Sequence, residues 1–192
     1  EIKRQFSIST TMVPIEYEGA EGKIKINLLD TPGYFDFVGE VEEAVSAADA
    51  AIIVVNCKAG IEVGTEKAWD LCEEYKLPRI IFVTNMDDDH ASFRELILKL
   101  EKKFGRKIAP FQVPIRENEK FVGFVNAVKM QGRRFTNLSD YEDCEIPEYT
   151  KKNLGIIRDA LIEAVAETSE EYMERYFSGE EFTQDEIYTA VQ

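Results

Sequence analysis

The sequence predicts an α/β fold in which a doubly wound, mostly parallel sheet is joined to a smaller part of mixed strands and helices. Two continuous apolar runs, 51–55 and 80–83, are typical of parallel strands that are buried on both faces. Apolar residues recur at helical spacing after each run, over 64–75 and 92–104. Strand and helix therefore alternate through this half of the chain, as they do in a doubly wound sheet.

The first two strands precede this alternation. Apolar residues alternate with polar ones between Lys23 and Leu29, and more loosely over 1–18, so both stretches are predicted strands. The sequence Gly19-Ala20-Glu21-Gly22 predicts a hairpin turn between them. We therefore expect an antiparallel pair at one edge of the sheet, followed by a helix over 37–48.

The pattern changes after Gly105, where turn signals separate several short strands. We therefore expect residues 1–108 to form the α/β core and residues 109–192 to form an inserted α+β subdomain. In order, the expected segments are strands at 111–115, 121–125 and 130–135, a polar acidic loop at 136–148, and helices near 154–165, 170–177 and 185–191.

The composition narrows the class of function. A formal net charge of −14 argues against a surface that binds duplex DNA or a membrane, but it leaves room for a ribonucleoprotein partner. No apolar run approaches the roughly 18 residues of a membrane helix. The three cysteines are widely spaced, and His90 has no Cys or His neighbour at metal-ligand spacing, so neither a disulfide framework nor a zinc site is predicted. These features predict a cytoplasmic protein.

One turn is the candidate site, Asp30-Thr31-Pro32-Gly33-Tyr34, which lies between a predicted strand and a predicted helix. Ligands of open α/β sheets bind at the C-terminal ends of strands. A glycine there lets backbone N–H groups approach a phosphate oxygen, and an aspartate can hold Mg²⁺ directly or through water. The same residues also suit an ordinary turn, in which Asp30 only caps and Pro-Gly only bends the chain.

Several further segments carry a resemblance that is far more specific than this short turn. They are Asn27–Gly33, Phe35–Phe37, Glu40-Val41, Pro78–Val83, Met86-Asp87, Ala91–Phe93, Val113–Ile115, Ala164–Thr168 and Tyr176–Glu181. In this order and spacing they resemble the GTPase domain of elongation factor G and its translational GTPase relatives, over nearly the whole chain. The resemblance implies part of a P-loop GTPase fold, with 109–192 as the insertion characteristic of elongation factor G.

The resemblance implies a role for several single residues. Asp30 matches the aspartate that reaches Mg²⁺ through water, and Gly33 matches the glycine whose N–H senses the γ-phosphate, a contact whose loss releases the switch. Ser7, in a stretch that resembles the end of the first switch, stands where the family has a Mg²⁺-binding threonine. Tyr34 replaces the histidine that positions the attacking water, as in a divergent group of elongation factor G-like paralogues. A phenol with a pKa of about 10 orients water without becoming a cation.

The family's guanine-reading motif, Asn-Lys-x-Asp, is matched by Thr84-Asn85-Met86-Asp87. Asp87 would accept the N1–H and N2–H₂ groups of guanine, a pairing that adenine does not offer. A reading shifted by one residue, which ends on Asp88, needs a slip after a strand that otherwise aligns without gaps, so we prefer the first reading. The implied nucleotide-binding residues are Asp30, Thr31, Pro32, Gly33, Tyr34, Thr84, Asn85, Met86 and Asp87, the implied Mg²⁺ ligands are Ser7 and Asp30, and Tyr34 is the implied catalytic residue.

The largest departure from the family's pattern is the absence of its phosphate-binding motif, because no Gly-x-x-x-x-Gly-Lys-[Ser/Thr] occurs in the chain. We expect that loop upstream, in a longer parent protein of which this chain is an inactive fragment. The resemblance implies that the parent binds GTP or GDP with Mg²⁺ and hydrolyses GTP. Its implied partner is the ribosome, through rRNA and ribosomal proteins, in a translocation-like elongation step. The alternative is a degenerate, non-hydrolysing module that binds the ribosome or another protein.

Overall fold

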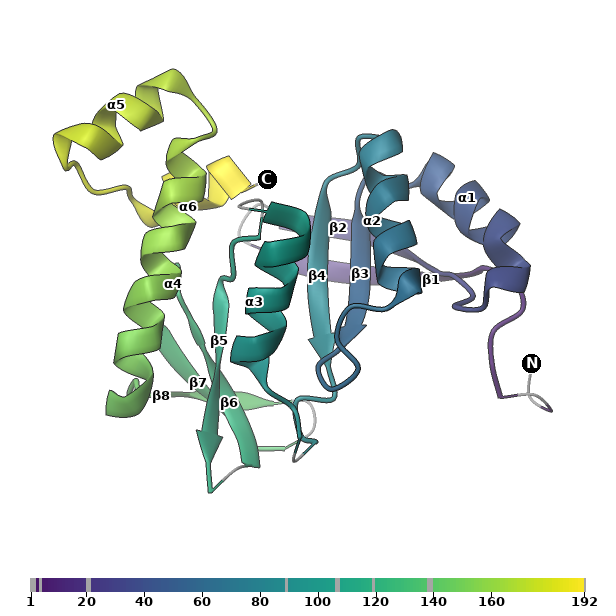
Figure 1. The fold of residues 1–192 in the computed structure, drawn as a ribbon, viewed down its shortest axis with the longest axis horizontal. Helices are drawn as coiled ribbons and strands as arrows, with labels where there is room; N and C mark the ends of the chain where they lie inside the picture. Colours follow the sequence, from purple (N-terminus) through teal and green to yellow (C-terminus); the bar gives the residue numbers. More distant parts are fainter. Residues whose placement is uncertain are drawn as a thin grey trace. The chain divides into compact units, whose positions relative to one another are not determined.

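The computed structural model describes residues 3, 5–19, 22–88, 90–105, 108–118, 120–137 and 140–191, whose course is drawn in Figure 1. These residues form two compact units, 1–55 with 61–83 and 56–60 with 84–192, and each unit is described by itself. Parts of three predicted segments lie outside the described residues: positions 1, 2 and 4 of the first strand, 20 and 21 of the hairpin turn, and 138 and 139 of the acidic loop.

The predicted hairpin is confirmed. β1 (Thr11–Gly19) and β2 (Gly22–Asp30) are antiparallel, and their register pairs Gly19 with Gly22 at the turn and Thr11 with Asp30 at the open end. Among the described residues, no further strand hydrogen-bonds to this pair, so the expected place of the pair at an edge of the parallel sheet is wrong. The strand predicted over 1–18 is shorter, because it begins only at Thr11 in the described part of the chain. The ladder makes Asp30 the last residue of a strand, with a backbone position that the partner strand fixes.

A β-α-β unit follows, made of β3 (Ala51–Asn56), α2 (Val63–Glu74) and β4 (Arg79–Thr84). The two strands are neighbours, and their arrows point the same way in Figure 1. α2 buries the face predicted for it, because Trp69 is buried and the guanidinium carbon of Arg79 lies 3.9 Å from the centroid of the Trp69 ring. The mixed α/β class with parallel strands is confirmed.

The prediction that both parallel strands are buried on both faces is wrong. Ile53 and Val55 are buried, but Ile52 and Val54 are 58% and 60% exposed. A continuous apolar run suits a strand between two layers, whereas in the described part of the chain only one face of this strand pair is covered. On β4 the exposed apolar side chains are Ile80 and Phe82.

Two helices begin within one residue of their predicted starts. A single 3₁₀ turn, η1 (Phe35–Phe37), leads into α1 (Val38–Ala47), so the helix predicted over 37–48 starts as a tighter turn. α3 (Phe93–Phe104) begins after Ser92, whose hydroxyl accepts the N–H of Glu95 and satisfies a donor that the first turn leaves free. Leu96 and Leu100, four residues apart, are buried, as the apolar spacing that predicts a helix over 92–104 requires.

The second unit contains a four-stranded antiparallel sheet in the order β5-β6-β7-β8 (Figure 1). Its strands are β5 (Gln112–Glu117), β6 (Lys120–Asn126), β7 (Gln131–Phe135) and β8 (Tyr141–Cys144).

The prediction of an acidic loop over 136–148 is wrong in part, because this segment contains β8. The sequence of β8 has no alternation of apolar and polar residues, and the strand forms by pairing with β7. In this pairing Cys144 lies opposite Gly132, and Tyr141 lies opposite Phe135. A Cβ at Gly132 would come within 2.7 Å of the Cys144 carbonyl oxygen, so this close pairing requires a glycine.

Three helices complete the unit: α4 (Glu148–Ala166), α5 (Glu170–Ser178) and α6 (Gln184–Val191). Gly179 adopts a left-handed φ of 79° and ends α5. None of the described helices combines the length and apolar character needed to cross a membrane. The core joins sheet and helices through Val113, Ile115, Val125, Leu154, Leu161, Val165 and Ile187.

Arg175 of α5 binds the start of α6 through one carboxylate. Its Nη1 donates to Glu186 Oε1 at 2.6 Å, while the N–H and hydroxyl of Thr183 donate to Glu186 Oε2 at 2.8 and 2.9 Å. These bonds, with that from Arg175 the strongest, lower the pKa of Glu186 from 4.5 to about 2. Folding therefore favours the charged carboxylate.

We expect Glu186→Gln to lower the thermal unfolding midpoint at neutral pH, with an effect that shrinks as the pH falls from 4.5 to about 2. Because the folded pKa lies below the unfolded one, the stabilisation is present above the unfolded value and is lost as pH falls through the folded value. Circular dichroism melts across this range measure it, with Asp185→Asn as the matched control on the same helix turn. A difference from wild type that stays constant with pH would contradict this origin.

Candidate functional site

The turn after β2 presents a carboxylate and an open space beside a glycine. Asp30 is exposed, and the buried Pro32 anchors the turn. Gly33 does not adopt a positive φ, and nothing lies within 4 Å of the position that a Cβ would take there. Neither the backbone conformation nor close packing requires a glycine at this position, and the space beside it is free for a ligand.

The chain that precedes β1 lies against this turn. The Phe6 ring centroid is 4.6 Å from that of Tyr34 and 6.5 Å from that of Phe37. Ser7, the next residue, is half-buried. The structure therefore brings the stretch that carries Ser7 to the turn that carries Tyr34.

Two hydrogen bonds join the same stretch to α1. The Thr10 N–H donates to Glu40 Oε2 at 2.6 Å, and the Thr10 hydroxyl donates to the Glu40 carbonyl oxygen at 3.1 Å. Glu40 thus ties the chain before β1 to the helix that follows the turn.

The loop after β4 is built by contacts within the second unit. The Cys57 N–H donates to the Thr84 carbonyl oxygen at 3.0 Å, and Asn56 Nδ2 donates to Asn85 Oδ1 at 3.0 Å. Asn85 has a φ of 54°, a left-handed conformation that asparagine tolerates and that reverses the chain direction. Met86 is buried, which leaves the exposed Asp87 at the tip of a loop with an anchored base.

The carboxylate of Asp88, the next residue, accepts hydrogen bonds from two other residues of the protein. Its Oδ1 accepts the His90 N–H at 2.9 Å, and its Oδ2 accepts a hydrogen bond from Lys58 Nζ at 3.1 Å. These contacts, the His90 bond first, lower the pKa of Asp88. The two neighbouring aspartates therefore differ, since Asp88 binds its own loop and Asp87 is exposed to solvent.

The predicted residues divide between the two units. Ser7 and the turn Asp30–Tyr34 belong to the first, and the loop Thr84–Asp87 belongs to the second. Each half is a coherent group of neighbours within its own unit.

The family model of the elongation factor Tu GTP binding domain matches residues 1–181. The chain belongs to this family. It is 35% identical over 181 residues to an elongation factor G-like protein of Thermotoga maritima, a match that covers 94% of this chain and 25% of that protein. It also matches a solved structure from Thermus thermophilus, with a TM-score of 0.88 and 33% identity, over 98% of this chain and 27% of the other. The chain thus spans about a quarter of the length of both relatives.

Membership confirms the resemblance to translational GTPases and identifies the α/β part as a P-loop GTPase fold. The family is one of GTPases, so membership also implies binding of guanine nucleotides. It assigns no role to a single residue of this chain. Those roles depend on the geometry described above.

Three contributors to the geometry were not identified from the sequence: Glu40, Asn56 and Lys58. Glu40 contacts a residue 30 positions away, and so does Lys58, so no local pattern marks either contact. Asn56 is marked in the sequence, since it is a polar amide at the end of an apolar strand, where ligand-binding loops of α/β sheets begin.

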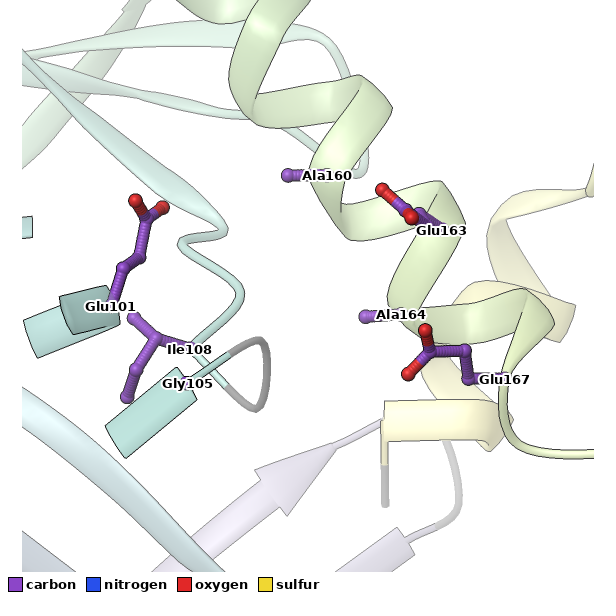
Figure 2. Close-up of a pocket in the computed structure, with 7 residues that line it drawn as sticks. All are labelled: Glu101, Gly105, Ile108, Ala160, Glu163, Ala164 and Glu167. Carbon is purple, nitrogen blue, oxygen red and sulfur yellow. The ribbon is translucent and has the colours of Figure 1, made fainter. Parts of the chain in front are cut away.

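The described residues also line a separate hollow in the second unit, open to solvent, of about 320 Å³. Figure 2 shows Glu101, Glu163 and Glu167 around it, with the short side chains of Ala160 and Ala164 along α4. Among the described residues, no group of three or more His, Cys, Asp or Glu side chains has an arrangement suited to a metal ion. The hollow contains none of the predicted site residues and is not the candidate site.

We expect Glu40→Ala to accelerate hydrogen exchange of the Thr10 amide in the natural protein that carries this chain. The substitution removes the carboxylate that accepts this N–H, so the amide should open to water more often. An increase of about fivefold or more is expected for loss of one charged hydrogen bond, measured by exchange with mass spectrometry or NMR. Glu42→Ala, on the exposed side of the same helix, is the matched control; equal protection in both variants would show that Glu40 does not tie the segment to α1.

Proposed function

We propose that this chain is part of a translational GTPase that binds GTP and Mg²⁺ and hydrolyses GTP in a ribosome-dependent, translocation-like step of elongation in the cytoplasm. The observation that carries the proposal is the turn after β2, where an exposed aspartate and an unobstructed glycine stand beside a segment tied down by Phe6 and Thr10. In a chain of this family, that pairing of segments is the arrangement a γ-phosphate switch needs.

Ser7 and Asp30 are the residues proposed to hold Mg²⁺. Both offer hard oxygen donors, which Mg²⁺ prefers, and the ion is commonly held by one or two protein oxygens together with nucleotide phosphates and water. When bound, Mg²⁺ neutralises charge on the phosphate oxygens. The N–H of Gly33 is proposed to donate to the γ-phosphate, because the space beside this residue is open.

Asp87 is proposed to read guanine, with Thr84, Asn85 and Met86 shaping its loop. Its carboxylate is exposed, whereas that of Asp88 accepts two hydrogen bonds from its own loop and from Lys58. This difference supports the reading of the motif that begins at Thr84 over the reading shifted by one residue. The N1–H and N2–H₂ of guanine would both donate to the Asp87 carboxylate.

Tyr34 is proposed to orient the attacking water through its hydroxyl. Its side chain is 57% exposed, and its ring contacts Phe6, which supports the phenol at the start of η1. A neutral phenol places a water by hydrogen bonding but supplies no positive charge near the phosphate. Hydrolysis should therefore be slower than with an imidazole at this position.

A second candidate function is a non-hydrolysing module that keeps the fold and docks on the ribosome or another protein. The ring contact of Tyr34 favours it, because a phenol held on Phe6 serves as well for packing as for chemistry. The two candidates differ in one measurement, the GTPase rate of the intact natural protein with ribosomes. A rate at the background of ribosomes alone would reject the enzyme and leave the docking module.

We expect the isolated 192-residue chain to bind GTP more weakly than micromolar and not to hydrolyse it. The phosphate cradle, with its backbone donors, lysine and Mg²⁺ hydroxyl, supplies most contacts to the β- and γ-phosphates. No such motif occurs in these residues. Titration with a fluorescent GTP analogue measures the affinity. A dissociation constant at or below the micromolar range would show that these residues bind the nucleotide by another route.

We expect Tyr34→His to raise ribosome-stimulated GTP hydrolysis in the intact protein by about tenfold or more, the order of effect that a positioned acid–base group has on rate. Phosphate release in single-turnover assays measures the rate. Tyr34→Phe, which keeps the ring contact with Phe6 and loses the hydroxyl, is the matched control and should lower the rate. If both variants hydrolyse at the wild-type rate, Tyr34 has no part in the reaction.

A further inference from the structure

The loop proposed to read the base receives an arginine from the inserted sheet. Arg116 lies on β5, and its Nη2 donates to the Met86 carbonyl oxygen and, at 3.3 Å, to the Asp88 carbonyl oxygen. These two carbonyls stand immediately before and after Asp87. One guanidinium nitrogen therefore bridges the residues on either side of the proposed base-reading carboxylate.

A β-bulge of the neighbouring strand lies opposite this arginine. The register of β5 with β6 pairs Ile115 with Gly123 and Arg116 with Phe121, so the ladder slips by one residue at this point. The extra residue is Val122 of β6, so two residues of β6 stand opposite one of β5 at this point, and the local twist of the pair increases. The Arg116 backbone is also fixed from α4, because the Tyr149 hydroxyl donates to its carbonyl oxygen at 2.7 Å. The position of the arginine is thus set by both the sheet and the helix of the second unit.

The loop is also held by Asn56, the last residue of β3, and by Lys58 in the segment that follows. Lys58 pairs with the Asp88 carboxylate at 3.1 Å, and Asn56 donates to Asn85 at 3.0 Å. Contacts from β5 and from the end of β3 thus both hold the loop, whereas the Asp87 side chain is exposed. A carboxylate that must accept two donors of one base benefits from a backbone that does not move.

We propose that Arg116 is a positioning residue that sets the guanine preference of the nucleotide site by fixing the loop on both sides of Asp87. This inference rests on the proposed role of Asp87 in base reading. It makes the inserted subdomain a structural part of base recognition. Movement of β5 or of the first turn of α4 would then change how tightly guanine is held.

The test compares GDP with inosine diphosphate, which lacks the 2-amino group that is proposed to donate a hydrogen bond to Asp87. Dissociation constants for both are measured on the intact natural protein by competition with a fluorescent GDP analogue. Arg116→Ala should reduce the GDP-to-inosine diphosphate preference by about tenfold, the order expected for loss of a charged hydrogen bond at the loop. Arg116→Lys, which keeps a charge but not the planar guanidinium, should give an intermediate preference.

Arg134→Ala is the matched control. Arg134 pairs with Glu117, the residue after Arg116, but makes no contact with the loop among those that the structure describes. It should lower the thermal unfolding midpoint as Arg116→Ala does while the GDP preference stays at the wild-type value. A general loss of stability would change affinity for the two nucleotides alike, and only a displaced Asp87 changes their ratio.

Two results would overturn the inference in distinguishable ways. If wild type prefers GDP and both Arg116 variants keep that preference, Arg116 does not position the loop, and the role of Asp87 stands. If wild type binds GDP and inosine diphosphate equally, Asp87 does not read the 2-amino group, and the positioning role falls with it. Where Arg116→Ala does not fold, the ratio measured on Arg116→Lys decides in the same way.

Discussion

Backbone hydrogen bonding along the strands determines where the candidate residues stand. Asp30, Asn56 and Thr84 are each the last residue of a strand, so their backbones are fixed on one side and their side chains lie where the next loop begins. Asn56 also shapes the loop that follows it, because its Oδ1 accepts hydrogen bonds from the N–H groups of Lys58 and Ala59 at 2.9 and 3.1 Å. Strand ends therefore impose their geometry on the polar residues that follow them.

The helices were predictable because their buried faces depend on local spacing. Trp69 and Leu96 recur with their neighbours every three or four residues, and that periodicity is present in the sequence whatever else surrounds the helix. The burial of β3 was not predictable in the same way, since Ile52 and Val54 are exposed or buried according to whether a second layer covers them. β8 was missed for a related reason: its formation depends on pairing with β7 across a turn.

The candidate site divides along the same line. The turn that begins at Asp30 was found because its residues are contiguous, and the loop that ends at Asp87 follows its strand directly. Glu40 and Arg116 act on segments about 30 residues away, and only the folded chain reveals what they touch.

The open apolar face of β3 and β4 has a consequence for handling the molecule. Ile52 and Val54 stand on a strand next to that of Ile80 and Phe82, so four large hydrophobic side chains line one side of a two-stranded sheet. A patch of this kind attracts a further layer of protein or, where none is available, another copy of itself. Association between copies rises with concentration, so dilution should keep a preparation of these 192 residues monodisperse.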